Sequence, residues 1–270
     1  MQLLKKYPQL KILKKLANEH KVEVHLVGGF LRDFVIGNTQ NDFDFAVEKG
    51  AIALARSFAN LIKGSYVLLD EENGCARVVR NEKDKMYTFD FADFRASTIE
   101  EDVKLRDFSL NTLTLPINTL KLSDSIRDCL VDHQRALKDI KAKRIKRTSI
   151  RAFSDDPLRM LRAFSLQASL GFRIELSTRN QIRKEADALR KVSVERIREE
   201  FWKILESERT YAVIKSMDQI GFLEKIIPQI HVMFDCEQGG FHHLDVWNHS
   251  LEALRQLEKI LPKLQDDEEL

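Results

Sequence analysis

Two aspartates two residues apart, Asp42 and Asp44, carry side chains that could bind a metal ion. They lie in the stretch Asn41–Val47, where acidic and aromatic residues alternate as in a strand. Successive side chains of a strand point to opposite faces, so both carboxylates lie on one face and Phe43 and Phe45 on the other. Such a pair suits Mg²⁺, which binds through a few carboxylates and substrate phosphates. The alternative is a solvated strand edge.

A Gly-Gly turn precedes this strand. Gly28 and Gly29 end an apolar run that begins at Val22, and a predicted helix over Phe30–Ile36 follows them. Glycines at such a turn let backbone N–H groups approach a phosphate with no Cβ in the way. Strand, turn, helix and acidic strand together predict a site for a metal ion and a triphosphate.

Residue patterns also predict the elements that must position this site. Helical spacing predicts a helix over residues 3–19 with one leucine face toward a core: Leu3, Leu4, Leu10, Leu13 and Leu16. A further helix over residues 51–62 and strands over 66–69, 76–79 and 86–94 predict a mixed sheet. From Ser177 onward the pattern is helical, with helices predicted over residues 178–189, 193–205, 211–217 and 221–227.

Composition argues against a membrane-spanning, a disulfide-rich and a zinc-binding protein. The 270 residues are 43% hydrophobic and 32% charged, and no apolar run approaches the ~20 residues that span a bilayer. Cys75, Cys129 and Cys236 are odd in number and far apart, which argues against disulfides and a zinc site and fits a reducing cytoplasm. The net charge is only +2, so nucleic-acid binding must come from local patches.

Residues 26–47 resemble the start of the class II tRNA nucleotidyltransferase and bacterial poly(A) polymerase family, within the DNA polymerase β-like superfamily. Three later stretches resemble the family's motifs in the same order: Glu100–Asn111, Asp155–Phe164 and Ser193–Leu205. The resemblance implies an α/β (α+β) nucleotidyltransferase head over residues 1–145, an all-α neck over 146–205 and an all-α body over 206–270.

The resemblance also implies the chemistry of the head. A nucleoside monophosphate would pass from CTP, or ATP, to the 3′ hydroxyl of a tRNA acceptor end, and pyrophosphate would leave. Asp42 and Asp44 would hold two Mg²⁺ ions, and Asp90 would complete the carboxylate set. Gly28, Gly29 and Arg32 would position the triphosphate. The alternative for Asp90 is an exposed charge on a strand.

The second motif departs from the family pattern Arg-Arg-Asp-Phe-Thr-Ile-Asn-Ala, because Leu105 replaces the first arginine. Arg106 would then contact the triphosphate or sugar, with Asp107 as the neighbouring carboxylate and Asn111 as a capping or sugar-side amide. A surface salt bridge is the alternative for Arg106.

The third motif resembles the family's Glu-Asp-x-x-Arg base reader, with Asp155 in place of the glutamate. Pro157 suits the first turn of a helix capped by Asp155 or Asp156, on which Asp156, Arg159 and Arg162 would share one side and contact the base. Where the family has its next arginine, this chain has Ser165. An ordinary helix ion pair is the alternative.

A carboxylate beside a guanidinium presents an acceptor next to donors. Cytosine and adenine offer an amino donor next to a ring acceptor and match that pair, whereas uracil and guanine would leave polar groups unpaired. The motif over Ser193–Leu205 resembles the family's helix-stabilising segment, with Ser193 capping the helix.

Half of the residues over 138–151 are lysine or arginine. Such a run forms either a solvated face or a phosphate-contacting one. In an enzyme that holds a tRNA acceptor end we expect the second, with the contacts made by Lys141, Lys143, Arg144, Lys146 and Arg147.

Residues 241–249 resemble the entry to a His-Asp phosphohydrolase-like domain that some family members append. The set cannot be completed before Leu270, so we assign no metal to His243, Asp245 or His249. The family's tail domain, which grips the tRNA elbow, is missing too, and we expect a truncated or shortened member.

The resemblance implies that nucleotide specificity depends on the segment before Arg106. Family members that add both C and A carry a flexible segment there, whereas only Ala96–Leu105 separates Arg95 from Arg106. We therefore expect addition of two cytidines with little A. The rivals are a CCA- or A-adding enzyme, a poly(A) polymerase acting on general RNA, and a non-catalytic RNA-binding protein.

Overall fold

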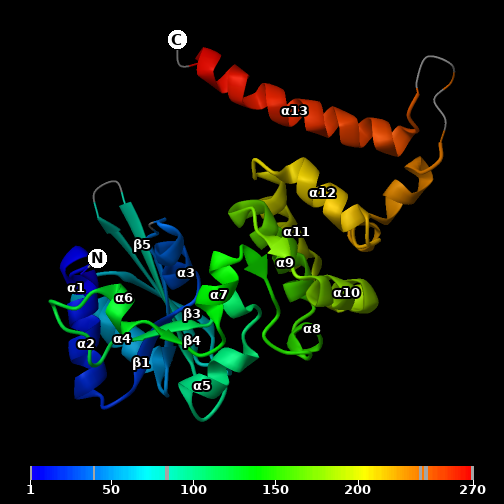
Figure 1. Ribbon diagram of the computed structural model, residues 1–270. Coiled ribbons are helices and arrows are strands. Elements are labelled where there is room, and N and C mark those ends of the chain that lie inside the picture. The colour runs from blue at the N-terminus through cyan, green and yellow to red at the C-terminus, as the bar shows by residue number, and fades with distance from the viewer. Residues whose placement is uncertain (1, 39, 83–84, 237–238, 240–242, 269–270) are drawn as a thin grey trace. The chain divides into compact units, whose positions relative to one another are not determined.

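The computed structural model describes residues 2–38, 40–82, 85–236, 239 and 243–268 (Figure 1). The chain forms two compact units, one of residues 1–142 and 147–149, the other of residues 143–146 and 150–270. The predicted boundary after residue 145 lies within the segment where the chain passes between the units. The predicted division of the helical part at residue 205 stays a prediction.

In the described part of the first unit, a seven-stranded mixed sheet has the order β3-β4-β5-β2-β1-β6-β7. Among the described strands of this sheet, only β2 and β5 pair in parallel, and the other neighbours are antiparallel. The predicted mixed sheet is confirmed. Its strands are β1 Val24–Val27, β2 Asp42–Val47, β3 Ser65–Asp70, β4 Cys75–Glu82, β5 Lys85–Asp93, β6 Leu113–Pro116 and β7 Val131–Asp132.

The helices of the first unit pack beside this sheet, with α4 against β3, β4 and β5 and α3 against β1, β2 and β6 (Figure 1). They are α1 Leu3–Lys6, α2 Gln9–Glu19, α3 Gly29–Ile36, α4 Ala51–Ile62, α5 Ile99–Asp102, α6 Ile126–Cys129 and α7 Ala136–Lys141, with 3-10 turns η1 Val103–Leu105 and η2 Ser109–Asn111.

The single helix predicted over residues 3–19 is wrong, because Tyr7 and Pro8 interrupt it and separate α1 from α2. Proline lacks a backbone N–H and disfavours helical geometry in the residue before it. The five leucines predicted to face the core are nevertheless all buried.

One face of the sheet carries a cluster of phenylalanine rings. Phe43 stacks on Phe89 and Phe45 on Phe91, with ring centroids 5.2 and 5.1 Å apart. Phe58 of α4 meets both Phe89 and Phe91 edge-on, so α4 covers this face. The alternation of β2 therefore places Asp42 and Asp44 on the opposite face, as predicted.

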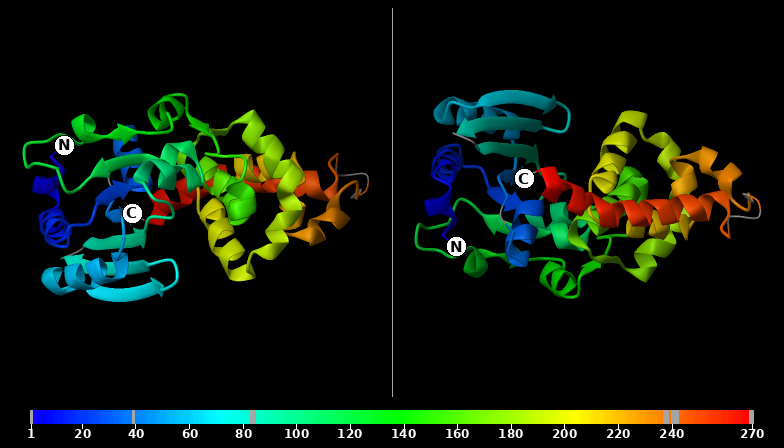
Figure 2. Two further views of the ribbon diagram at one scale, coloured as in Figure 1. Left: turned by 90° about the horizontal axis from the view of Figure 1, so that it is seen from below. Right: turned by 90° about the horizontal axis from the view of Figure 1, so that it is seen from above.

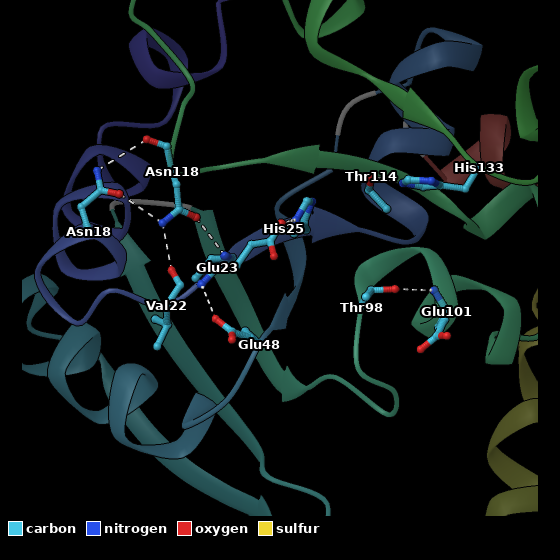
Figure 3. Close-up of polar contacts among 11 residues, drawn as sticks. Asn18, Val22, Glu23, His25, Glu48, Thr98, Glu101, Thr114, Asn118 and His133 are labelled. Atoms are coloured by element: carbon cyan, nitrogen blue, oxygen red, sulfur yellow. Dashed lines mark hydrogen bonds and ion pairs between the residues drawn. The ribbon is translucent and has the colours of Figure 1, made fainter.

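Asn118 fixes the entrance to β1 (Figure 3). Its Oδ1 accepts the backbone N–H of Val24 at 2.9 Å, and its Nδ2 donates to the carbonyl of Val22 at 2.9 Å and to Asn18 at 3.1 Å. One side chain thus joins the end of α2, the start of β1 and the segment after β6. Because β1 leads directly to Gly28, this clamp sets the position of the Gly-Gly turn.

The described part of the second unit is mainly helical, with α13 alongside α12 (Figure 2). Its helices are α8 Ala152–Asp155, α9 Leu158–Leu170, α10 Leu176–Glu185, α11 Val194–Leu205, α12 Thr210–Asp218 and α13 Val246–Glu268, with 3-10 turns η3 Ala186–Lys191, η4 Leu223–Lys225 and η5 Pro228–Met233.

Three expectations for this unit need correction. It is not all-α, since β8 Arg144–Ile145 pairs in parallel with β9 Arg173–Ile174. The predicted helix over residues 221–227 is only the turn η4, which lies between Gly221, with φ of 68°, and Pro228. Ser193 stands at the N-cap of α11, but its side chain makes no capping hydrogen bond.

Within the described residues, no helix combines the length and apolar character that a membrane span requires.

Replacing Asn118 tests the clamp on β1. Asn118→Ala removes all three hydrogen bonds and leaves the partly buried N–H of Val24 and carbonyl of Val22 without these partners, so we expect the first unit to lose about 1 kcal/mol of stability. Urea denaturation followed by circular dichroism measures this loss. Asn73→Ala is the control, because the Asn73 side chain donates to Asp70 at an exposed turn far from β1. Equal stability of the two variants would show that Asn118 does not hold β1 in place.

Candidate active site

The acidic face of the sheet carries a row of residues in register across five strands. Thr114 of β6 is opposite Val27, Val27 is opposite Asp44, Asp44 is opposite Asp90, and Asp90 is opposite Arg77 of β4. Directly opposed residues share a face of the sheet. The structure therefore brings Asp90 beside Asp44, with Asp42 two residues along the same exposed face of β2.

Arg77 is a member of this row that the sequence did not single out. Its Nε and Nη2 donate to Asp90 Oδ1 and Oδ2 at 2.7 and 2.8 Å. The pKa of Arg77 is raised, first by these hydrogen bonds and further by the charges of Asp90, Asp42 and Asp44, against partial desolvation. The sequence shows only that Arg77 lies in a predicted strand. Its partner depends on the register between β4 and β5, which the sequence pattern does not specify.

Gly28 lies against Asp44 and can only be glycine. Its φ of 76° and ψ of −145° are unfavourable for any residue with a side chain. A Cβ at this position would lie 2.7 Å from Asp44 Oδ2, and a Cβ on Gly29 would lie 3.3 Å from Arg32 Nη2. Because neither glycine has a side chain, the backbone of the turn can lie close to Asp44 on one side and to the Arg32 guanidinium on the other.

Arg32, Asn111 and Asp107, which are far apart in sequence, form one buried network. Arg32 donates to both carboxylate oxygens of Asp33 at 2.8 and 2.9 Å, and through Nη1 to Asn111 Oδ1 at 2.8 Å. Asn111 Nδ2 in turn donates to Asp107 Oδ1 at 3.0 Å. The network connects α3, the helix after the Gly-Gly turn, to the segment that contains Asp107 and Asn111. These predicted site residues therefore hold one another in position.

Arg106 makes a salt bridge, although not the surface bridge that the sequence left open as the alternative. Its Nη2 and Nε donate to Asp102 Oδ2 at 3.0 and 3.2 Å, and Asp102 also accepts the backbone N–H of Arg95 at 3.1 Å. Asp102 is only 2% exposed, so the bridge is largely buried. A contact of Arg106 with a triphosphate stays a prediction.

The acidic face offers a cation two carboxylates. In the described residues, no group of three or more His, Cys, Asp or Glu side chains is arranged to hold a metal ion. Asp42 and Asp44 are exposed beside the open turn at Gly28 and supply the oxygen ligands that suit Mg²⁺ together with substrate phosphates. This pair fits a magnesium ion, whereas Arg77 engages both oxygens of Asp90.

In the second unit, Asp156 is the C-cap of α8 and lies just before α9, not on that helix as predicted. Its backbone is extended, with φ of −149°, because a residue before proline avoids helical geometry. Its Oδ1 accepts the backbone N–H of Leu158, the first residue of α9, at 3.1 Å, although Pro157 and not Asp156 stands at the N-cap position. Its Oδ2 accepts a bond of 2.9 Å from Arg196 Nη2, a partner from α11 that sequence reasoning missed.

Arg159 shares this turn with Asp156, since its backbone N–H donates to the Asp156 carbonyl at 3.1 Å. Arg159 is buried, with 8% of the residue exposed, and its Nη1 donates to the carbonyl of Ala152 at 3.2 Å. Arg162, by contrast, is exposed. Ser165 donates to the buried Glu200.

The predicted RNA-contacting residues differ in exposure. Lys141, Lys143 and Lys146 are exposed, whereas Arg144 and Arg147 are half-buried. The lysines can therefore meet a phosphate backbone directly.

Of the histidine-rich stretch, Phe241 and His242 lie outside the described residues. Asp245 accepts the backbone N–H of Asn248 at 2.7 Å and stabilises the start of α13.

Two family models match this chain. Residues 24–146 match the model described as "Poly A polymerase head domain", which includes the whole acidic row and the Arg32 network. Residues 171–234 match the model described as "Probable RNA and SrmB- binding site of polymerase A", which includes Arg196.

Curated relatives cover most of the chain. It is 33% identical over 237 residues to an A-adding tRNA nucleotidyltransferase of Deinococcus radiodurans, across 86% of this chain and 51% of that protein. It is 32% identical over 238 residues to a CC-adding tRNA nucleotidyltransferase of Geobacter sulfurreducens, across 88% of this chain and 53% of that protein. The chain thus spans about half the length of these relatives.

A solved structure confirms the predicted class of fold. The Thermotoga maritima CCA-adding enzyme complexed with tRNA-CCA matches 95% of this chain and 57% of its own, with a TM-score of 0.75 and 26% identity.

Gly28→Ala tests the close approach of the turn to Asp44. The new methyl group must displace Asp44 Oδ2, so we expect Mn²⁺ binding, followed by electron paramagnetic resonance, to weaken by about tenfold or more. Gly50→Ala is the control, because Gly50 has a similar positive φ, 75°, and a Cβ placed there would meet nothing within 4 Å. Equal weakening in both variants would mean that backbone strain, and not displacement of Asp44, is responsible.

Proposed function

The chain belongs to the family of poly(A) polymerases and tRNA nucleotidyltransferases, and from this membership we propose that it adds nucleotides to the 3′ end of tRNA without a template. It takes CMP from CTP, adds two cytidines and releases pyrophosphate. The observation that carries the proposal is the exposed pair Asp42 and Asp44 beside the open backbone of Gly28.

The first unit supplies the chemistry of transfer. Asp42 and Asp44 would hold Mg²⁺, two ions by analogy with the family, which when bound offsets the triphosphate charge and lowers the pKa of the attacking hydroxyl. The turn at Gly28 and Gly29 presents backbone N–H groups at the start of α3, where a triphosphate is favoured. The 3′ oxygen then bonds to the α-phosphorus as the bond to pyrophosphate breaks.

Base selection falls to Asp156 and Arg159. Each Asp156 oxygen accepts one hydrogen bond within the protein, from Leu158 or Arg196, and so retains a lone pair for a base amino group. Cytosine and adenine supply that donor, whereas uracil and guanine place a carbonyl there. The exposed lysines Lys141, Lys143 and Lys146 would contact the acceptor-end phosphates.

Restriction to cytidine is supported by the anchoring of the segment before Arg106. Thr98 caps α5 by accepting the N–H of Glu101 at 3.3 Å, and Ile99 and Val103 pack in a buried cluster with Val27 and Ala46. A segment whose apolar side chains are buried against the sheet resists rearrangement. It therefore offers little freedom to reshape the base site from CTP to ATP.

A second candidate is terminal A addition, which the similarity to the Deinococcus radiodurans A-adding enzyme favours. The remaining rivals are a full CCA-adding enzyme, a poly(A) polymerase and a non-catalytic RNA-binding protein.

One experiment separates these functions. The protein is incubated with Mg²⁺, CTP and ATP and with tRNA ending at the discriminator base, at C or at CC, and the 3′ ends are sequenced. We expect tRNA ending in CC and no further extension. Asp42→Asn and Asp44→Asn should reduce transfer to background while leaving the unfolding transition unchanged, because both side chains are exposed.

Other 3′ ends would identify the rivals. Products ending in CCA contradict the CC-only proposal, A added only to tRNA ending in CC identifies an A-adding enzyme, and long A tails identify a poly(A) polymerase. Absence of any transfer overturns the enzymatic proposal.

Replacing Arg196 tests base selection. In Arg196→Ala the Asp156 carboxylate loses the partner that orients it, so we expect the preference for CTP over UTP in kcat/KM to fall about tenfold or more. Arg198→Ala, an exposed arginine on the same helix, is the control. An unchanged preference in Arg196→Ala would reduce the Asp156 contact to a structural salt bridge.

A further inference from the structure

Arg77 and Asp90 form an ion pair within the acidic row. They are directly opposed on β4 and β5, and the guanidinium contacts both carboxylate oxygens through two parallel hydrogen bonds. Two-point contacts of this kind fix the carboxylate more firmly than a single bond. Asp90 is therefore held in one orientation, toward β4.

On its other side, Asp90 is opposite Asp44 of β2, and neighbouring strands lie only about 4.8 Å apart. A cation bound by Asp42 and Asp44 would thus have a third carboxylate within easy reach. Arg77 competes for that carboxylate and adds a positive charge close to the cation. Both effects weaken cation binding.

We propose that Arg77 is a positioning residue that keeps Asp90 out of the cation shell of the enzyme without substrate, an inference that rests on the proposed function. Divalent cation binding then depends on the phosphates that the nucleotide brings. This arrangement would favour turnover, because a cation held by only two carboxylates can leave with pyrophosphate faster than one held by three.

Fold stability does not account for this ion pair. The Arg77 and Asp90 side chains are 44% and 29% exposed, and pairs of such exposure contribute little to folding. Arg80 of the same strand provides a matched comparison. Its Nε lies 2.6 Å from Glu82 Oε1, with exposures of 29% and 37%, but the alternation of β4 places it on the face opposite Arg77.

The test measures Mn²⁺ binding to the full chain without nucleotide, by electron paramagnetic resonance of free Mn²⁺. We expect Arg77→Gln to bind Mn²⁺ about tenfold more tightly than the wild type, through lost repulsion and a freed ligand. Arg80→Gln should stay within about twofold of wild type. Both variants should unfold at similar temperatures.

A double-variant cycle shows whether Arg77 acts through Asp90. In the Asp90→Asn background, Arg77→Gln removes only repulsion, so its gain in affinity should be at least about threefold smaller than in the wild type. Equal gains in both backgrounds, or no gain in Arg77→Gln, would overturn the inference and leave the proposed function intact. Wild-type Mn²⁺ binding insensitive to Asp42→Asn and Asp44→Asn would overturn both.

Discussion

The stacking of phenylalanine rings on one face of the sheet is the interaction on which the site depends. Phe43 and Phe45 of β2 pack on Phe89 and Phe91 of β5, and all four rings are buried. A slip of one residue would expose the two rings of β2 to water, at about 2 kcal/mol or more each. The same alternation that buries these rings fixes Asp42 and Asp44 on the opposite, open face, so hydrophobic packing sets the position of the acidic site.

Features of the site that depend on local pattern could be predicted from the sequence. The shared face of Asp42 and Asp44 follows from alternation, the contact of Asp156 with the start of α9 from the residues around Pro157, and the bounds of α4 from its apolar period. Each of these involves residues within a few positions of one another. Asp156 lies before the helix because a residue that precedes proline avoids helical geometry, and this constraint outweighs the three-residue spacing from Asp156 to Arg159.

Contacts between distant residues could not be predicted. Arg32 reaches Asn111, 79 residues away, and Arg196 reaches Asp156, 40 residues away. Arg77 is only 13 residues from Asp90, yet their contact depends on the register of the hairpin between them. No periodic pattern specifies which arginine meets which carboxylate, because that choice depends on how strands and helices pack once the core has formed.

Both units use an arginine from a neighbouring element to orient a carboxylate. Arg77 holds Asp90 at both oxygens, whereas Arg196 contacts one oxygen of Asp156. The difference suits the two proposed tasks. A base reader needs a fixed carboxylate with lone pairs still available, because discrimination arises from leaving the wrong base unpaired. A cation site that must release pyrophosphate needs a carboxylate withheld until substrate arrives. A single arginine hydrogen bond therefore leaves Asp156 able to accept a bond from a base, whereas two arginine hydrogen bonds hold Asp90 back from a cation.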